Sequence, residues 1–305
     1  MTLTRRTVLK GAGAAFAALA ARPVWAATEL TLGDTRIFSL SDGHLTLPPE
    51  FIFAPMPKRE LAPILAEHGL GDAPLTPPCN VTLMQSGDRL VLFDAGSGLS
   101  FQDSAGKLPD ALDAVGLAPG DVTHVVFTHG HPDHLWGVLD DFDEPLFANA
   151  EHMIGKAEWD YWWNPNTVEE IGAERTAMAV GAKRRLEALE DAVSFFEDGQ
   201  EILPGVAALA TFGHTPGHMS FELRSGGDSV LVVGDAIGNH HVAFERPDWP
   251  SGSDQDQPTA AATRSRLLDR LAAERMRMIG FHLPAGGMGH VERKGAAYRF
   301  VPSQG

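Results

Sequence analysis

The first part of the chain alternates apolar and polar residues in short runs, which is the pattern of strands buried on one face. These runs predict strands at residues 35–40, 81–85 and 90–93. Between the first two of these strands, residues 45–78 are rich in proline and contain one helix-like stretch, 58–67. We expect a long surface loop there.

The rest of the chain alternates helix-like and strand-like segments in two successive sets. Helical periodicity predicts helices at 108–115, 151–163, 169–189 and 258–275. Apolar runs predict strands at 123–128, 206–211, 219–224, 229–233, 276–281 and 298–301. Alternation of this kind predicts an α/β fold in which helices cover both sides of the sheet.

Composition changes this picture little, but charge and cysteine content exclude several classes of protein. The chain has 305 residues, of which 44% are apolar and 21% charged, as is usual for globular proteins. A formal net charge of -16 repels phosphate groups, so we expect neither nucleic acid nor an anionic membrane as a partner. Cys79 is the only cysteine, which excludes an intramolecular disulfide and a cysteine-rich zinc cluster.

The first 26 residues have the pattern of an export signal. A basic start containing Arg5 and Arg6 precedes a mildly apolar run, and small residues lead to a cleavage site after about Ala26. The run is too short to span a bilayer, and the paired arginines resemble the twin-arginine signal. We therefore expect a twin-arginine-type signal peptide at 1–26, a single mature domain at 27–305 and a periplasmic location.

Four potential metal ligands follow the predicted strand 123–128 within six residues, namely His129, His131, Asp133 and His134. His129 and His131 are two positions apart in extended chain, so their side chains point the same way. Pro132 suits the first turn of a following helix. Imidazole and carboxylate are common ligands of zinc and similar ions, so this motif predicts a metal site.

Three further candidates are far apart in the sequence but lie in equivalent places. His214 follows the strand 206–211, Asp235 ends the strand 229–233, and His282 ends the strand 276–281. Functional sites in layered folds form at the carboxyl ends of strands. Taken alone, each of the three residues is interpreted equally well as a metal ligand or as an ordinary core or turn residue.

Together these motifs resemble the metallo-β-lactamase superfamily, from about Thr35 to the end of the chain. The resemblance implies a four-layer αββα sandwich with two divalent ions at one edge, zinc being preferred over manganese, iron or cobalt. The implied roles are His129, His131 and His214 for the first ion, Asp133, His134 and His282 for the second, Asp235 as the bridging carboxylate, and Asp94 as a residue that orients ligands.

The same resemblance implies a mechanism. Two ions that share a hydroxide lower its pKa towards 7 and polarise the bond under attack. The implied catalytic carboxylates are Asp235, which bridges the two ions, and Asp133, which binds the second ion and orients the nucleophile or accepts its proton.

Within the superfamily, the chain most resembles methyl parathion hydrolase and its relatives. Ser41-Asp42-Gly43, the His-Pro-Asp-His run and residues 289–302 carry this resemblance. It implies an exported hydrolase of a small apolar ester, lactone or phosphotriester. The alternatives are a glyoxalase-type thioester hydrolase and a non-catalytic periplasmic metal-binding accessory protein. Whether the chain forms a homodimer is left open.

Several residues are candidates for the surroundings of the metal site. Trp136 stands where a Gly-Gly pair is usual and is expected to reshape the pocket. Trp162 is interpreted either as an aromatic wall of the pocket or as a core residue. Further candidates are His240 and His241 in the pocket lining, Phe51, Phe53 and Met56 in the opposite wall, and His218 beside the ligands rather than among them.

Overall fold

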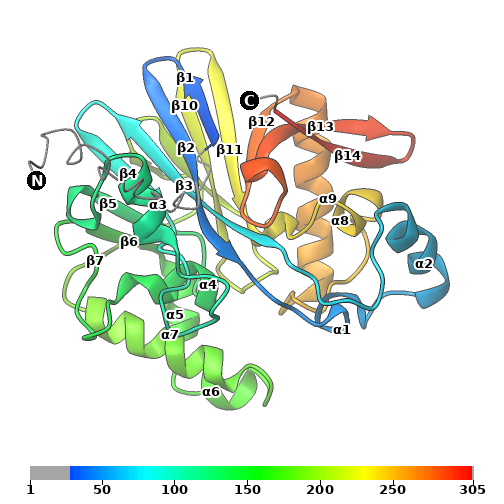
Figure 1. Ribbon diagram of the computed structural model, residues 1–305, viewed down its shortest axis with the longest axis horizontal. Coiled ribbons are helices and arrows are strands. Elements are labelled where there is room, and N and C mark those ends of the chain that lie inside the picture. The colour runs from blue at the N-terminus through cyan, green and yellow to red at the C-terminus, as the bar shows by residue number, and fades with distance from the viewer. Residues whose placement is uncertain (1–27, 304–305) are drawn as a thin grey trace, which may run out of the picture.

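The computed structural model describes residues 28–303, which form two seven-stranded sheets packed face to face (Figure 1). The first sheet has its strands in chain order. They are β1 Thr28–Leu32, β2 Thr35–His44, β3 Pro78–Ser86, β4 Arg89–Phe93, β5 His124–Phe127, β6 Glu151–Gly155 and β7 Val193–Phe196. The proposed signal peptide, 1–26, lies outside the described residues.

The second sheet runs in the reverse of chain order, from β14 to β8. Its strands are β8 Glu201–Leu203, β9 Val206–Ala210, β10 Met219–Ser225, β11 Asp228–Gly234, β12 Arg277–Gly280, β13 Met288–Lys294 and β14 Ala297–Pro302. In each sheet the strands that precede the candidate ligands pair in parallel, β4 with β5 and β11 with β12. Their carboxyl ends therefore meet at one edge.

Helices cover both outer faces of this pair of sheets. The α-helices are α1 Pro49–Phe53, α2 Lys58–Glu67, α3 Leu108–Ala114, α4 Pro132–Leu135, α5 Lys156–Trp163, α6 Thr167–Glu170, α7 Thr176–Leu189, α8 Val242–Glu245 and α9 Gln257–Glu274. Short 3-10 turns lie at η1 Pro119–Asp121, η2 Trp136–Val138, η3 Asp235–Ile237 and η4 Ala285–Gly287. Figure 1 shows α3, α5 and α7 against the first sheet, and α8 and α9 against the second.

Three buried clusters fill the spaces between the four layers. One lies between the sheets, where Phe93 of β4 meets Phe221 of β10 at 5.1 Å between ring centroids. The other two pack each sheet against its helices, with members such as Phe127 and Leu186 on one side and Leu231 and Leu268 on the other. Burial of apolar area on both faces of both sheets stabilises the predicted αββα sandwich, which is confirmed.

The structure corrects several predicted elements. The predicted helix 151–163 begins as strand β6, and only Lys156–Trp163 is helical. The run Glu-His-Met-Ile-Gly is short and apolar in part, and it extends the parallel sheet next to β5. The predicted helix 169–189 is broken into α6 and α7. Besides β6, four strands were not predicted, namely β1, β7, β8 and β13.

The segment 45–78 is not simply a surface loop. Besides α2, which matches its predicted bounds, it contains α1, and its Phe53 and Met56 form a small apolar core together with Trp249 from outside the segment. It lies at the edge of the sandwich where the ligand-bearing strands end (Figure 1). Within residues 28–303, no helix is both long enough and apolar enough to cross a membrane.

Candidate metal centre

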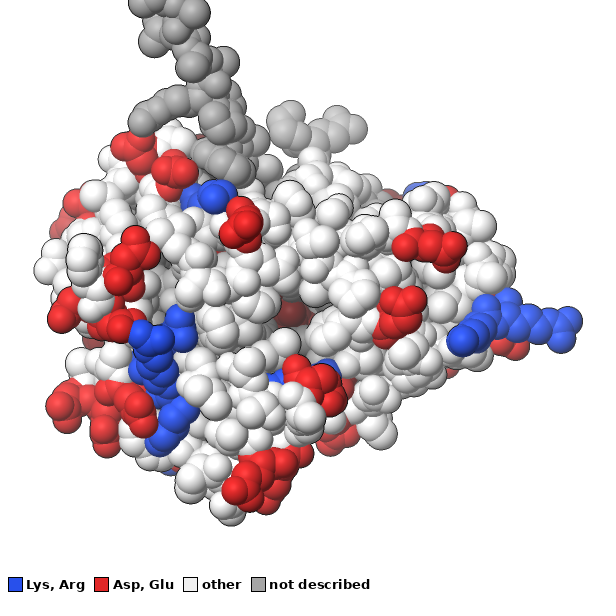
Figure 2. All heavy atoms as spheres, turned by 60° about the horizontal axis from the view of Figure 1, so that its bottom comes forward, with Lys and Arg blue, Asp and Glu red and all other residues white. Residues whose placement is uncertain are grey.

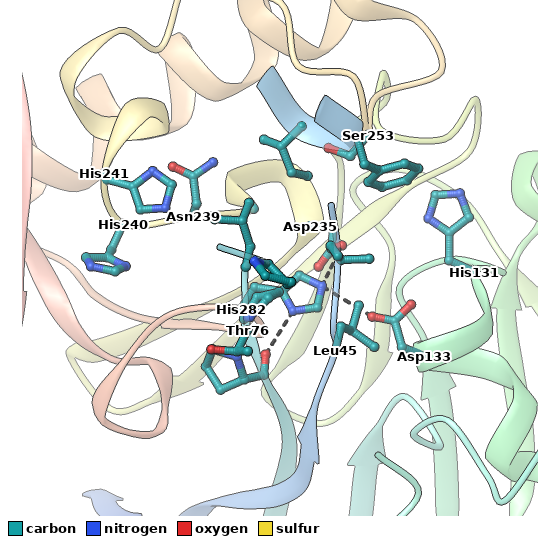
Figure 3. Close-up of a pocket in the computed structure, with 18 of the residues that line it drawn as sticks. Leu45, Thr76, His131, Asp133, Asp235, Asn239, His240, His241, Ser253 and His282 are labelled. Atoms are coloured by element: carbon teal, nitrogen blue, oxygen red, sulfur yellow. Dashed lines mark hydrogen bonds and ion pairs between the residues drawn. The ribbon is translucent and has the colours of Figure 1, made fainter. Parts of the chain in front are cut away.

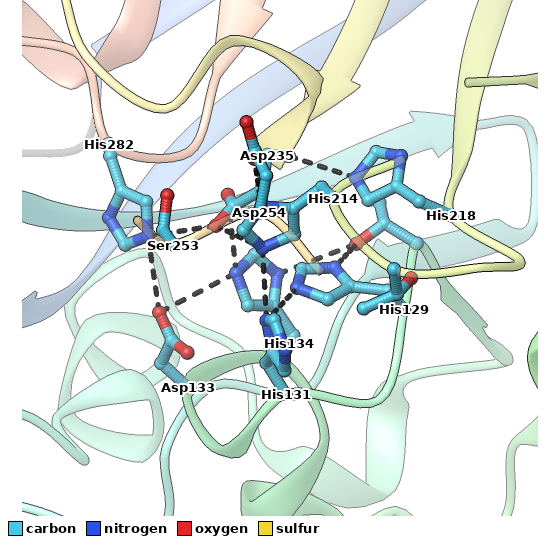
Figure 4. Close-up of polar contacts among 12 residues, drawn as sticks. His129, His131, Asp133, His134, His214, His218, Asp235, Ser253, Asp254 and His282 are labelled. Atoms are coloured by element: carbon cyan, nitrogen blue, oxygen red, sulfur yellow. Dashed lines mark hydrogen bonds and ion pairs between the residues drawn. The ribbon is translucent and has the colours of Figure 1, made fainter. Parts of the chain in front are cut away.

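Three imidazoles converge on one point at the edge of the sandwich (Figure 4). His129 Nε2 lies 3.0 Å from His131 Nδ1, which lies 2.9 Å from His214 Nε2. All three side chains are buried. The pKa values of His129 and His131 lie well below the ordinary value, mainly because the rings are buried and also because other imidazoles lie nearby. Both rings are therefore neutral, and their lone pairs are free to bind an ion.

A second group lies directly beside the first and contains two carboxylates. His282 Nε2 lies 3.2 Å from both Asp133 Oδ2 and Asp235 Oδ2. His134 Nε2 lies 3.4 Å from Asp235 Oδ1 and 3.5 Å from Asp133 Oδ2. Three of these buried atoms, Asp133 Oδ2, His134 Nε2 and Asp235 Oδ1, have no hydrogen-bond partner, which is the state expected of groups that ligate an ion.

Asp235 lies between the two groups. Besides facing His134 and His282, its Oδ2 lies 3.4 Å from His214 Nε2 of the first group. Asp235 directly follows Gly234, the last residue of β11. Gly234 pairs with Gly280 of β12, and His282 follows Gly280 by two residues. The sheet register thus places one carboxylate against both sets of imidazoles.

The second group is electrostatically incomplete without cations. Burial lowers the pKa of His134, but the carboxylates of Asp235, Asp133 and Asp94 outweigh burial and raise that pKa to about 10. The same balance raises the pKa of His282 well above its ordinary value. Protons therefore occupy these imidazoles in the metal-free protein, and divalent ions would displace them.

Each candidate imidazole is fixed from behind by a partner on its other nitrogen. His134 Nδ1 donates to Asp94 Oδ2 at 2.7 Å, and His282 Nδ1 donates to the Pro78 carbonyl at 2.8 Å. His129 Nδ1 lies 2.9 Å from Thr128 Oγ1, whose own hydroxyl donates to Asp94. Such contacts fix the tautomer that presents a lone pair inwards. The donor set and its unpartnered atoms fit two divalent ions.

Asp94 has the orienting position that the resemblance implied. Its backbone adopts φ +73°, a left-handed conformation that is uncommon outside glycine. Its carboxylate also accepts the Thr128 backbone N–H at 2.7 Å, which ties the end of β4 to the start of the histidine motif. His218 likewise lies behind the site, because its Nε2 accepts the Asp235 backbone N–H at 3.0 Å and so is not turned towards an ion.

Sequence analysis missed two residues that hold the first group. His214 Nδ1 donates to Asp254 Oδ1 at 3.0 Å, and Asp254 is itself paired with buried Arg264 at 3.2 Å. The Gln255 amide lies 3.2 Å from His131 Nε2. Both residues are on the loop before α9, far from either histidine motif in sequence, and no local pattern marks them.

A third missed residue, Glu158 of α5, connects the two histidine motifs. Its side chain is fully buried and accepts four hydrogen bonds. The donors are Gly130 N at 2.8 Å, Trp162 Nε1 at 2.5 Å, Thr215 Oγ1 at 2.7 Å and Gly217 N at 3.0 Å. Gly130 lies between His129 and His131, and Thr215 follows His214, so one carboxylate braces all three ligands of the first group.

Cys79 lies closer to the site than its position in the sequence indicated. Its thiol, a carboxylate oxygen of Asp133 and a ring nitrogen of His282 all lie within 4.8 Å of one another. Burial raises the pKa of Cys79 to about 12, so the thiol stays protonated at neutral pH. A protonated thiol is a poor ligand, which leaves Asp133 and His282 as the binding groups.

A cavity of about 400 Å³ opens onto this centre (Figure 3), and Figure 2 shows a hollow at this end of the molecule. Its lining includes His131, Asp133, His214, Asp235 and His282. The opposite wall is apolar and comes largely from the segment 45–78, through Leu45, Leu47, Phe51, Ile52, Leu70, Pro74 and Leu75. A pocket of this composition suits a small, largely apolar substrate.

The structure separates the remaining pocket candidates. His240, His241 and Phe51 line the cavity, whereas Phe53 and Met56 are buried beneath it. The aromatic-wall interpretation of Trp162 is wrong, because its side chain is only 1% exposed and packs behind His131 with its N–H bound to Glu158.

Trp136 also lies outside the lining, which corrects the expectation that it reshapes the pocket directly. Its ring packs against the Cα of Gly181 on α7, where an added Cβ would lie 2.1 Å from the ring. It also contacts Phe101, which does line the cavity, at 5.5 Å between ring centroids.

Comparisons with known proteins agree with this geometry. A profile of the family described as "Metallo-beta-lactamase superfamily" matches residues 76–281. Metallo-beta-lactamase domain-containing protein 1 from Xenopus laevis is 32% identical over 179 residues, which are 59% of this chain and 58% of that protein. N-acyl homoserine lactonase AttM from Agrobacterium fabrum is 30% identical over 127 residues, which are 41% of this chain and 44% of that protein. The chain thus matches about half the length of these relatives.

Two solved structures are similar over nearly their whole length. One is AidC, described as a dizinc quorum-quenching lactonase, with a TM-score of 0.87 and 25% identity. The other is the hydrolase AbOPH, with a TM-score of 0.85 and 26% identity. Each alignment covers 93% of this chain and 99% of the other.

Proposed function

Because the chain belongs to the metallo-β-lactamase superfamily, we propose that it is a metal-dependent hydrolase that opens lactones or cleaves small esters bearing an apolar chain. The observation that carries this proposal is the shared position of Asp235 between two sets of imidazoles, at the floor of an apolar cavity. The similarity to AidC and AttM, both described as lactonases, favours the lactone.

In this proposal the chain holds two divalent ions, most simply zinc. His129, His131 and His214 would hold the first ion, and Asp133, His134 and His282 would hold the second, with Asp235 placed beside both groups. When bound, such ions activate water and polarise a carbonyl oxygen.

The chain's own residues contribute orientation and proton transfer. Asp133 and Asp235 line the cavity, so either carboxylate is placed to hold a proton that leaves the attacking water. Asp94, Asp254 and Glu158 hold the imidazoles in fixed orientations, which avoids reorganisation during the reaction. The apolar wall formed by segment 45–78 excludes water from the substrate chain.

A substrate panel on the metal-loaded protein tests the proposal. We expect turnover of γ-lactones and aryl esters, with weaker or no turnover of thioesters and phosphotriesters. Preferred turnover of thioesters would support a glyoxalase-type enzyme, and preferred turnover of phosphotriesters would support the methyl parathion hydrolase-like branch. A fully loaded protein that is inactive on the whole panel would contradict the proposal and favour a metal-binding accessory protein.

We further propose that the chain is exported to the periplasm through the twin-arginine route, on the strength of Arg5-Arg6 and the mild apolar run that follows. Replacing both arginines with lysine is expected to leave the unprocessed precursor in the cytoplasm. Unchanged periplasmic accumulation of this variant, measured by cell fractionation, would contradict this route.

A further inference from the structure

One cationic side chain lines the cavity and has no role in the centre described above. Among the described residues that line it, Arg175 is the only lysine or arginine. It precedes α7 and is half-buried. The protein as a whole has 40 acidic and 24 basic residues, so acceptors for a cation are plentiful elsewhere. Figure 2 shows acidic side chains outnumbering basic ones on this face of the molecule.

Arg175 is held in place but is not neutralised. Its Nη2 donates to the Gly252 carbonyl at 2.6 Å, and within residues 28–303 no carboxylate lies within ion-pair distance. Burial lowers the pKa of Arg175, although the charges of Glu174, Tyr161 and Asp254 oppose this effect, and a guanidinium stays protonated at neutral pH. The other N–H groups of the guanidinium have no acceptor among the described residues. A half-buried guanidinium whose remaining N–H groups have no acceptor in the protein can bind an acceptor that arrives with the substrate.

The neighbours of Arg175 place it between the metal centre and the apolar wall. Gly252, to which it is bound, donates its backbone N–H to the Ile52 carbonyl of α1 at 2.8 Å, and Ile52 belongs to the apolar wall. On the other side, helix α7, which begins directly after Arg175, packs against α4, which carries Asp133, and both residues line the cavity. A substrate that lies across the cavity therefore meets the metal centre, Arg175 and the apolar wall in turn.

We propose that Arg175 is a specificity-determining residue that binds an oxygen acceptor of the substrate, such as an amide carbonyl or a carboxylate, placed between the bond that is cleaved and the apolar chain. This inference rests on the proposed hydrolase function. It predicts that the enzyme prefers lactones and esters with such a second polar group to plain alkyl ones. A guanidinium suits this role because it presents several donors in one plane.

The test compares Arg175→Met with wild type on two lactones of similar size, N-hexanoyl-homoserine lactone, which has an amide, and γ-decalactone, which has none. We expect the KM of the amide lactone to rise about 10- to 100-fold with kcat little changed, as for loss of a hydrogen bond to a charged group. γ-Decalactone is expected to lose far less, at most the effect of the lost Gly252 contact that both lactones share. Arg184→Met is the matched control, since Arg184 lies on α7 but is exposed and paired with Asp143.

Equal losses on both lactones would overturn the inference, because loss of the Gly252 contact alone would affect both substrates alike. Calorimetric binding of the two ring-opened products gives a readout that does not need turnover. If wild type opens neither lactone, the proposed function fails. The role of Arg175 still stands if wild type binds N-hexanoyl-homoserine about 10-fold more tightly than Arg175→Met does, while both proteins bind 4-hydroxydecanoate equally. Equal binding of each product by the two proteins would contradict that role.

Discussion

Three of the candidate imidazoles are each held from behind by an oxygen acceptor of a single residue. A carboxylate supports His134 and another supports His214, while a backbone carbonyl supports His282. Glu158 differs from these because it contacts no imidazole and instead holds the backbone beside the ligands. Its effect on the site therefore depends on having two acceptor oxygens.

Glu158→Gln is expected to weaken metal binding while leaving the fold intact. A glutamine amide has one acceptor and one donor group, so its NH₂ must face N–H or O–H donors that now bond to the carboxylate. Residues that support ligands typically contribute about 10- to 100-fold in metal affinity. Chelator competition measures this affinity, and the loss is expected for the ion that His129, His131 and His214 would hold.

The control for this variant is Glu169→Gln, an exposed carboxylate on neighbouring α6. It carries the same change in charge without the buried contacts. Equal metal affinities for Glu158→Gln and wild type would contradict a role of Glu158 in positioning the ligands.

At the scale of elements, α5 joins the core of the first sheet to the metal centre. One face of this eight-residue helix carries Glu158, and the following turn carries Trp162, which donates to the same carboxylate. The Trp162 ring also fills the space behind Gly130, where an added Cβ would lie 2.5 Å from the indole nitrogen. Helix α5 is therefore a support of the site and not a wall of the cavity.

The sequence predicted the strands that carry ligands better than it predicted their supports. The apolar run at β5 is followed at once by the histidine motif, so both signals are local. By contrast, Glu158 and Asp254 look like ordinary surface acids in the sequence, because the histidine motifs that they hold lie 28 and 40 residues away. The strand β6 was mistaken for helix because five residues next to a true helix do not separate the two periodicities.

Trp162→Ala is expected to destabilise the fold and leave substrate preference unchanged. Removing a buried tryptophan costs about 3–5 kcal/mol in the free energy of unfolding. Aryl and alkyl esters should lose activity by the same factor, because the ring does not line the cavity. Thermal melting and kcat/KM on both ester classes measure these effects.

Trp162→Phe is the matched variant, since it keeps one aromatic ring while it removes the N–H bond to Glu158 and the second ring of the indole. We expect a smaller fall in melting temperature than for alanine. A selective loss on aryl esters, with the melting temperature unchanged, would restore the aromatic-wall interpretation.

For the whole molecule, the metal centre joins the two sheets, since its ligands come from the ends of strands in both. Stability and metal binding are therefore expected to depend on each other. In the metal-free protein, the carboxylates are balanced by protons on His134 and His282, whose pKa values are raised. Ions would replace these protons and stabilise the folded state.

The metal-free protein is expected to lose stability as the pH rises from about 7 towards 10. The pKa of His134 is about 10 in the folded state and 6.5 as its ordinary value. A raised pKa stabilises the folded state fully below the unfolded value, and this stabilisation disappears as the pH passes through the folded value. Melting temperatures of the metal-free and metal-loaded forms at several pH values measure this effect.

The metal-loaded form is the control, because bound ions keep these imidazoles deprotonated throughout the range. Its melting temperature is expected to vary less between pH 7 and 10 than that of the metal-free form. Parallel profiles for the two forms would contradict a common site for the protons and the ions.

The central claim is that two ions share Asp235 in one hydrolytic centre. Its most direct test is the rate of lactone opening by metal-free protein as zinc is added in known molar equivalents. The account predicts that the rate rises until two equivalents per chain are bound and then stays constant, with Asp235→Ala inactive at every ratio. A break at one equivalent, or full activity in Asp235→Ala, would contradict it.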